Sequence, residues 1–418
     1  MMNAVKKDYP KIVVTPPGPK AEQIIAKDAH YASTSYIKEY PLVAARGEGA
    51  MLEDVDGNRY LDFMAGIAVS ATGYAHPRVV AAAKSQLEKF AHLCATDFYY
   101  SAFSELCERL AKIAPGSDPK RVFLTNSGTE AVEGAIKLAR SHTKRQNVIA
   151  FSGAFHGRSI AAMSLGSSKV RQRRHFGPLL PGVHHLPYDN PYRPVDWRAA
   201  ARELFRERLG EDEVAAVVVE PILGEGGYVV PSTAFLQHWR DFCDRTGALL
   251  VYDEVQSGVG RTGKMFAAEA LGVLPDVYLL AKGLGSGLPI GAIIARDSVM
   301  SWDHGSHGST FGGNPVACAA ALATLDLVEE SLMANASAMG ALLLEGLRTI
   351  ARKHQIIGDV RGMGLMIGIE FVRDRATKEP YEHLVHQIEL EAFKRGLLLL
   401  GCGRSTIRIA PPLVIDRD

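Results

Sequence analysis

The chain has 418 residues, 47 of them basic and 46 acidic, so its formal net charge is only +1. A balance this close to zero argues against a nucleic acid or an anionic membrane as a partner. The length allows roughly two to three domains, and about half of the residues are apolar, enough for a large core. The N-terminal segment contains no long apolar run. We therefore expect neither a signal peptide nor a membrane anchor. The expected compartment is the cytoplasm.

The cysteines are scattered, odd in number and form no Cys-X-X-Cys pair. They are Cys94, Cys107, Cys243, Cys318 and Cys402. This pattern argues against a disulfide framework and against a zinc site, and it fits a reducing compartment. We expect no metal site elsewhere either: His184 and His185 are adjacent, so their side chains should diverge.

The N-terminal quarter predicts an arm followed by a hairpin. Residues 1–20 contain four prolines and little periodicity, which indicates an extended arm. A short helix is expected over Ala21–Ala29. The stretch Gly49–Gly66 is typical of two strands around a turn at Asp56–Asn58. Its acidic spacing also resembles a calcium loop, but the remaining ligands of such a loop are missing, so the hairpin is favoured.

The middle of the chain alternates between helical and strand patterns. His76-Pro77 opens one helix, with Pro in its first turn, and Ala102–Ile113 forms another. Short apolar runs then alternate with amphipathic segments from Arg121 to Ala295, which predicts a mostly parallel, doubly wound sheet. The predicted strands are Arg121–Thr125, Asn147–Phe151, Glu213–Glu220, Ala248–Asp253 and Val277–Ala281. Pro178–Pro194 is rich in proline and is expected to be a loop.

A helix begins directly after the first of these strands. Ser127, Gly128 and Thr129 occupy its N-terminus. Free backbone N–H groups and the helix dipole attract a phosphate there, and Gly allows close approach. The alternative is an ordinary N-cap by Ser or Thr.

Two charged side chains follow neighbouring predicted strands. Ala248–Asp253 is apolar and aromatic until it ends in a carboxylate and a Gly-rich loop, typical of a buried strand whose carboxyl end faces a ligand. Lys282 stands alone between the apolar run Val277–Ala281 and several glycines. A desolvated lysine has a lowered pKa and attacks carbonyls. A carboxylate for a pyridinium nitrogen and an amine for a Schiff base together indicate a pyridoxal 5'-phosphate (PLP) site.

Three further candidates lie in the loop Gly153–Ser159. Phe155 is suited to stack on a flat ring, His156 to lie beside it, and Arg158 to bind a carboxylate through two hydrogen bonds. Each of these residue types is more often structural, but their position in a loop after a strand favours a site. The run Gly283–Gly287 imitates a dinucleotide fingerprint only weakly, because its spacing is wrong and no helix follows.

The C-terminal part predicts a long helix and then a small α+β domain. Helical periodicity extends from Val316 to His354. The small domain is built from a strand pattern in Arg361–Val372, a helix around Leu384–Arg395, and strands at Leu397–Leu400 and Thr406–Ala410.

Seven segments, in this order, resemble the class III (ω-amino acid) aminotransferases. They are NSGTEA, AFHGR, EPILGEGG, DEVQSGVGRTG, AKGL, STFGGNP and IRIAPPL. The resemblance is strongest to the 4-aminobutyrate aminotransferase group. It implies the PLP-dependent transferase fold type I, with a mostly parallel seven-stranded sheet in a large domain and a smaller α+β domain. The implied division is an N-terminal arm with part of the small domain in residues 1–75, the large domain in 76–315 and the rest of the small domain in 316–418.

The resemblance also implies cofactor roles. Lys282 would form the Schiff base and carry the proton, and Asp253 would pair with the pyridine nitrogen. Gln256 would bind the phenolic oxygen of the ring, with Val255 and Phe155 on its two faces and His156 beside it. Phosphate ligands would be Ser127, Gly128, Thr129 and, from a neighbouring subunit, Thr310. A homodimer, or a dimer of dimers, with shared sites is therefore expected.

Substrate roles follow in the same way. Arg158 would bind the carboxylate remote from the reacting amine, and Arg408 the α-carboxylate of 2-oxoglutarate. Glu225 would pair with Arg408 when an ω-amino donor is bound, and Ile67 would line the substrate side. The expected partners are thus an amino donor such as 4-aminobutyrate and a 2-oxo acid. Ornithine and acetylornithine aminotransferases and broad-specificity amino-acid racemases share much of this set and remain alternatives.

Overall fold

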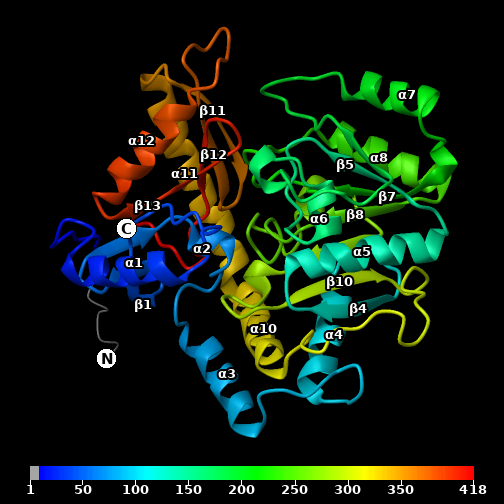
Figure 1. The fold of residues 1–418 in the computed structure, drawn as a ribbon, viewed down its shortest axis with the longest axis horizontal. Coiled ribbons are helices and arrows are strands. Elements are labelled where there is room, and N and C mark those ends of the chain that lie inside the picture. Colours follow the sequence, from blue (N-terminus) through cyan, green and yellow to red (C-terminus); the bar gives the residue numbers. More distant parts are fainter. Residues whose placement is uncertain (1–8) are drawn as a thin grey trace.

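A seven-stranded sheet is the largest layer of the computed structural model, which describes residues 9–418 (Figure 1). In spatial order its strands are β4 (Lys120–Thr125), β10 (Gly291–Arg296), β9 (Val277–Leu280), β8 (Leu249–Asp253), β7 (Val214–Val219), β5 (Asn147–Phe151) and β6 (Val183–Leu186). Only β10 is antiparallel to its neighbours. The pairs from β9 to β6 are all parallel. The predicted mostly parallel sheet is confirmed.

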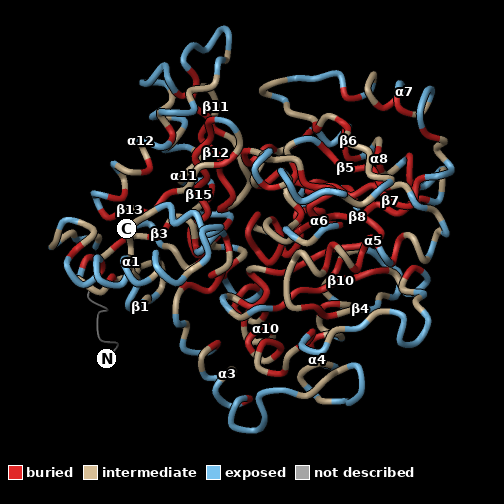
Figure 2. The backbone as a smooth tube through the Cα atoms, viewed as in Figure 1, coloured by how far each residue is buried: buried red, intermediate tan, exposed pale blue. Residues whose placement is uncertain are grey.

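Alternate side chains of these strands enter two separate cores, because successive residues of a strand point to opposite faces. In β8, Leu249 and Val251 pack on the side of α5 (Gly128–Thr143), whereas Leu250 and Tyr252 pack on the side of α8 (Thr233–Thr246). All six residues of β7 are buried, as are those of β8 and β9, and the middle of this sheet is mostly red in Figure 2. Helices therefore cover both faces, as a parallel sheet requires.

Two of the helices around the large sheet begin at or next to the positions stated above: α3 (Pro77–Lys89) at Pro77, and α4 (Ser101–Ile113) at Ser101, one residue before Ala102. Ser232 caps α8 through a hydrogen bond from the N–H of Phe235, and Gly247 ends it with a φ of 75°. A left-handed residue of this kind favours glycine. The others are α6 (Ile160–Leu165), α7 (Trp197–Glu207) and α9 (Ala267–Leu271).

One prediction in this region is wrong. Pro178–Pro194 is not entirely loop, because β6 lies within it and pairs with β5 in parallel. Its two histidines diverge as expected: the Nε2 of His184 contacts Asn147, and that of His185 contacts the carbonyl of Leu165.

Two smaller four-stranded sheets combine the ends of the chain. One has the order β1 (Ala44–Glu48), β2 (Met51–Asp54), β3 (Arg59–Asp62) and β13 (Leu397–Leu398), and the other β11 (Ile357–Met363), β12 (Met366–Phe371), β15 (Thr406–Ile409) and β14 (Leu400–Cys402). We predicted one strand over Leu397–Leu400. The structure divides it, because Leu397 pairs with β3 and Leu400 pairs with β15.

The predicted hairpin forms from β2 and β3, which are antiparallel. Its acidic residues bind backbone rather than a cation: the carboxylate of Asp54 accepts from the N–H of Asp56 and of Asn58. The carboxylate of Asp56 accepts from the N–H groups of Lys20 and Ala21 in α1 (Pro19–Tyr31). These bonds explain the acidic spacing without calcium. Residues 1–8 of the predicted arm lie outside the described part of the chain.

A continuous helical segment connects the large sheet to the C-terminal sheet, as the periodicity predicted. It consists of α10 (Pro315–Leu327), a π-helical turn (Val328–Leu332) and α11 (Met333–Lys353). In Figure 1 it crosses the molecule between the two halves. α10 packs on α3 and α4, while α11 packs on β11 and β12. The remaining helices are α2 (Ala65–Ala68) and α12 (Glu382–Phe393). The residue boundaries of the domains stay a prediction.

Candidate active site

Polar side chains from several strands meet at one edge of the large sheet. Because β4, β5, β7, β8 and β9 run in the same direction, their carboxyl ends share that edge. A cavity of about 420 Å³ opens there. Ten predicted site residues line it: Ser127, Gly128, Thr129, Phe155, His156, Arg158, Asp253, Val255, Gln256 and Lys282.

Asp253, the last residue of β8, is only 6% exposed and has partners for both oxygens. Its Oδ2 accepts a hydrogen bond of 2.7 Å from the Nδ1 of His156, and its Oδ1 accepts one from the N–H of Val255. Burial opposes the charged form of His156, but the hydrogen bond and charge of Asp253 raise the pKa of its imidazole. The pair thus places a hydrogen-bonded carboxyl group of fixed orientation at the buried cavity.

Glu220 follows β7 at the same edge and is fully enclosed. Its two oxygens accept 2.8 Å hydrogen bonds from the N–H of Phe155 and of Gly224. Burial raises the pKa of its carboxyl to about 7, partly offset by the nearby charge of His156. Glu220 therefore fixes two loops of the cavity, and it contributes less negative charge at neutral pH than an exposed glutamate would.

Lys282 follows β9 and begins a short 3₁₀ turn (Lys282–Leu284) with a strained φ of 40°. Burial, together with the smaller effect of the charge of Arg408, lowers the pKa of its ammonium to about 8. Asp253, Glu220 and Glu225 oppose this shift. A substantial fraction of the amine is consequently neutral near physiological pH and available as a nucleophile or a base.

The N-terminus of α5 borders the cavity. Ser127 caps this helix, since its Oγ accepts from the N–H of Glu130 at 3.3 Å. The hydroxyl of Thr129 contacts the Oγ of Ser159 at 2.7 Å. Ser127 accepts in its contact, so its O–H hydrogen can still donate to an anion, as can the first backbone N–H groups of the helix, which have no partner within it. The N-cap and the anion site coexist here.

Gln256 and Val255 present defined groups to the cavity. The Oε1 of Gln256 accepts a hydrogen bond of 2.7 Å from the hydroxyl of Tyr228, which leaves its amide N–H groups as donors. A Cβ added to Gly128 would lie 2.9 Å from the methyl groups of Val255. Glycine is therefore required at the start of α5 for Val255 to occupy its present position.

Four predicted site residues lie outside the lining of this cavity. Arg408, on β15, is 5% exposed, and its Nη1 forms an ion pair of 3.1 Å with Glu225. The charges of both residues act on Lys282, so they lie close to the cavity. Ile67 is 42% exposed with a φ of 70°, and Thr310 is exposed in the loop before α10. The structure of this single chain brings neither of them into the cavity.

The sequence alone did not reveal every lining residue. Asn126 lines the cavity, and its Nδ2 contacts both Glu130 and Ser309. Its position directly before Ser127 was the only available signal. Val69 and Gly287–Ile290 also line the cavity, but their residue types carry no chemical signal.

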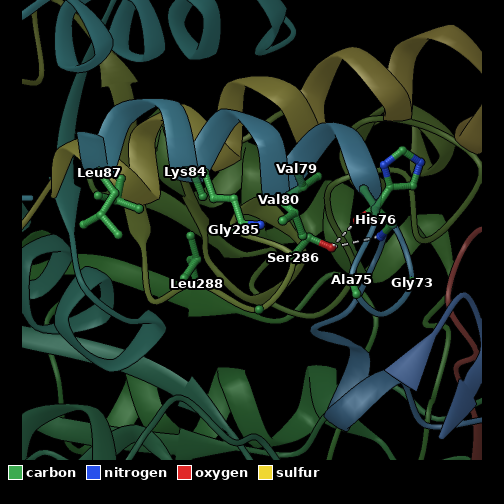
Figure 3. Close-up of a pocket in the computed structure, with 14 residues that line it drawn as sticks. Gly73, Ala75, His76, Val79, Val80, Lys84, Leu87, Gly285, Ser286 and Leu288 are labelled. Atoms are coloured by element: carbon green, nitrogen blue, oxygen red, sulfur yellow. Dashed lines mark hydrogen bonds between the residues drawn. The ribbon is translucent and has the colours of Figure 1, made fainter. Parts of the chain in front are cut away.

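A second cavity, of about 310 Å³, lies between α3 and the loop that follows Lys282 (Figure 3). Val79, Val80 and Leu87 of α3 face Leu288 across it, and the Oγ of Ser286 bonds to Thr72. The two cavities share Gly287 and Leu288. Among residues 9–418, no carboxylate lines the second cavity, so the paired acid and amine needed for catalysis belong to the first.

The family described as Aminotransferase class-III matches residues 32–418. The chain belongs to the class III aminotransferases. The predicted resemblance is thereby confirmed, as is the fold type I architecture. Among residues 9–418, no helix is long and apolar enough to cross a membrane.

Relatives of the aminotransferase differ in activity. An alanine/serine racemase from Pyrococcus horikoshii is 40% identical over 437 residues, covering 100% of this chain and 91% of the relative. The 4-aminobutyrate aminotransferase GabT of Escherichia coli is 42% identical, covering 90% of each. An ornithine aminotransferase from Toxoplasma gondii, with PLP partly occupying its active site, is 34% identical with a TM-score of 0.83, covering 95% of this chain and 90% of the other.

The aminotransferase uses PLP, in keeping with its family, and the cavity suits that cofactor. The buried amine of Lys282 suits the aldehyde of the cofactor, and the buried carboxylate of Asp253 suits its ring nitrogen. The N-terminus of α5 suits its phosphate. The buried Nε2 of His156 has no partner within the described chain, and Phe155 and Val255 both line the cavity.

The buried lysine should also affect stability in the cofactor-free protein. The pKa of Lys282 falls from its usual 10.5 to about 8 on folding. At pH values between these two, Lys282 binds more protons in the unfolded chain than in the folded one, so the free energy of unfolding rises with pH in this range. Lys282→Met should raise the free energy of unfolding by roughly 3 kcal/mol at about pH 7, with a smaller gain at about pH 10.

Urea denaturation of both proteins at the two pH values measures this difference. Lys264→Met, at an exposed lysine, is the matched control and should change little. A gain independent of pH would show that Lys282 is not desolvated.

Proposed function

We propose that this aminotransferase moves an ω-amino group from 4-aminobutyrate or a similar ω-amino acid to 2-oxoglutarate, giving a semialdehyde and glutamate. The buried ion pair between Arg408 and Glu225 carries the proposal. An ω-amino donor has no α-carboxylate, whereas the acceptor has one. A buried guanidinium left without a partner is costly, so a carboxylate that masks it for the donor and withdraws for the acceptor suits both substrates.

Arg158 supports a second carboxylate position. It is exposed at the cavity, and its guanidinium carbon lies 5.6 Å from the centroid of the Phe155 ring. No ion pair of Arg158 is found within residues 9–418, so its planar group remains available to a carboxylate. Arg158 would bind the remote carboxylate of either substrate, and Arg408 the α-carboxylate of the acceptor.

The residues of the chain would divide the chemistry as follows. PLP, when bound, supplies the electron sink that lets a proton leave the carbon bearing the amine. Lys282 would hold the cofactor through its Nζ, accept that proton and return it to the neighbouring carbon. Asp253, oriented by His156, would keep a proton on the ring nitrogen.

The remaining predicted ligands would position the cofactor. Gln256 would donate to its phenolic oxygen, and Val255 and Phe155 would cover the ring. Ser127, Gly128 and Thr129 would bind the phosphate through the N-terminus of α5.

We also retain the homodimer, or dimer of dimers, as part of the proposal. Thr310 is exposed and outside the cavity of its own chain, which suits a phosphate ligand supplied to a neighbouring subunit. Ile67 would line the substrate side of the site. The cytoplasm is the proposed compartment, since all five cysteines are free thiols.

A racemase is the second candidate, because the racemase relative covers the whole chain. One assay separates the two activities. The holoenzyme is given a panel of amino donors, including ornithine and acetylornithine, with and without 2-oxoglutarate. Glutamate formed only with both substrates supports the proposed transfer. A single L-amino acid converted to its D-form without a 2-oxo acid, and no glutamate from any donor, would replace the proposal by the racemase.

Arg408→Ala should raise the KM for 2-oxoglutarate far more than the KM for the donor. A hydrogen bond to a charged group contributes about 1.5–3 kcal/mol, so an increase of roughly ten- to a hundredfold is expected. Arg404→Ala is a matched control, because Arg404 is exposed and pairs with Glu382 at the surface. Equal increases in the KM of both substrates would contradict the assignment of Arg408.

A further inference from the structure

Glu225 lies between two cations rather than one. Its Oε2 is 3.1 Å from the Nη1 of Arg408, and its Oε1 is 2.7 Å from the Nζ of Lys169. The side chain of Glu225 is 14% exposed, that of Arg408 is 6% exposed and that of Lys169 is 30% exposed. Each carboxylate oxygen therefore has its own partner, and the shorter of the two ion pairs is made by Lys169.

The backbone around Lys169 is fixed by hydrogen bonds. The N–H groups of Ser167 and Ser168 both donate to the carbonyl of Ala154. The Oγ of Ser167 donates to the carbonyl of Phe151, and the Oγ of Ser168 contacts Gln172 at 2.7 Å. Lys169 thus differs from an ordinary surface lysine, because the chain before it is attached to the end of β5 and the loop of the active site.

Glu225 and Arg408 come from elements that are attached to each other. The N–H of Gly403, in the turn between β14 and β15, donates to the carbonyl of Glu225 at 2.7 Å. A Cβ on Gly226 would lie 2.6 Å from the carbonyl of Gly153, so this loop also packs closely on the large-sheet side. Glu225 is consequently placed between a cation from the C-terminal sheet, Arg408, and a cation from the large-sheet side, Lys169.

Arg408 has unused hydrogen-bonding capacity in this arrangement. Its Nε is buried and has no partner within residues 9–418. A guanidinium binds a carboxylate best through two parallel bonds. The ion pair with Glu225 joins one nitrogen of Arg408, Nη1, to one oxygen, Oε2, at 3.1 Å. An incoming carboxylate can therefore offer Arg408 more than Glu225 does, provided that Glu225 is not left without a counter-ion.

From this geometry we infer that Lys169 is a positioning residue that retains Glu225 when it leaves Arg408, and thereby favours substrates with an α-carboxylate. The inference rests on the proposed function, in which Glu225 masks Arg408 for one substrate and releases it for the other. With Lys169 present, the displaced carboxylate keeps one of its two ion pairs. Without Lys169, displacement leaves a largely buried carboxylate unpaired, which is strongly unfavourable.

The test compares two non-reacting ligands on the holoenzyme by titration calorimetry. Glutarate carries a carboxylate at each end, and valerate carries only one. In Lys169→Met, the ratio of the dissociation constant of glutarate to that of valerate should rise about tenfold. Lys169→Arg keeps the positive charge and should restore most of the original ratio. Arg171→Met removes the same charge from an exposed side chain two residues away, and should leave the ratio unchanged.

A double-mutant cycle separates an indirect effect from direct contact with the ligand. If Lys169 acts through Glu225, Lys169→Met should have almost no further effect in a Glu225→Gln background. An undiminished effect there would overturn the inference, because Lys169 would then bind glutarate itself. An unchanged ratio in Lys169→Met alone would also overturn it.

Arg408→Ala distinguishes failure of this inference from failure of the proposed function. If glutarate binding depends on Arg408 but not on Lys169, only the role of Lys169 is wrong. If glutarate binding depends on neither, the assignment of Arg408 in the proposed function fails, and the inference fails with it.

Discussion

Replacing Lys282 by alanine should reduce turnover by at least about a thousandfold, because the change removes both a nucleophile and a proton carrier. The amine lies in the cavity beside Asp253, and burial lowers its pKa to about 8. No other lysine lines this cavity, so a substitute from within the described chain is not at hand. The measurement is the rate of glutamate formation with saturating donor and acceptor.

Two controls make the result specific to Lys282. Lys264→Ala, at an exposed lysine in the same segment of chain, should retain full activity. Borohydride treatment of the native holoenzyme should attach the cofactor covalently to the peptide that contains residue 282, and the alanine variant should yield no such peptide. Retention of full activity by Lys282→Ala, or covalent attachment elsewhere, would remove this lysine from its proposed role.

The strands and helices of the large sheet could be predicted because their signals are local. In β7 and β8 an apolar run marks the strand, and the helix predicted over Ala102–Ile113 is α4, which differs from it by one residue. β6 carried no such signal, since it has only four residues at the edge of the sheet inside a proline-rich stretch. The division of Leu397–Leu400 was also hidden, because it depends on which distant strand each residue pairs with.

The site shows the same limit. Asp253 and Lys282 could be predicted, because each directly follows an apolar strand and the ends of parallel strands converge. The hydroxyl of Thr129 contacts that of Ser159, which lies 30 positions away in the sequence, directly before α6. The segment around Ser127–Thr129 gives no sign of this distant contact. Lys169 could not be found at all, because its chemistry arises only from its contact with Glu225.

The second large effect is expected at Asp253. Asp253→Asn keeps the shape of the side chain but removes its charge, and so removes the group that would keep a proton on the cofactor ring. Breaking a buried charge pair costs about 3–5 kcal/mol, which corresponds to a loss in kcat of roughly a hundred- to several-thousandfold. His156 would lose the charged acceptor that raises the pKa of its imidazole, so the pH dependence of the visible absorption of the holoenzyme should shift as well.

Glu254→Gln provides the matched control, because Glu254 is the next residue and is equally buried. Its carboxylate accepts from the N–H groups of Ala267 and Ala268 at the start of α9, away from the cavity lining. That variant should lose stability, measured as a lower midpoint of thermal unfolding, while the visible absorption of the bound cofactor stays as in the native protein. If both variants lowered kcat equally and neither changed the absorption, the effect of Asp253 would be structural, and its pairing with the cofactor ring would have to be abandoned.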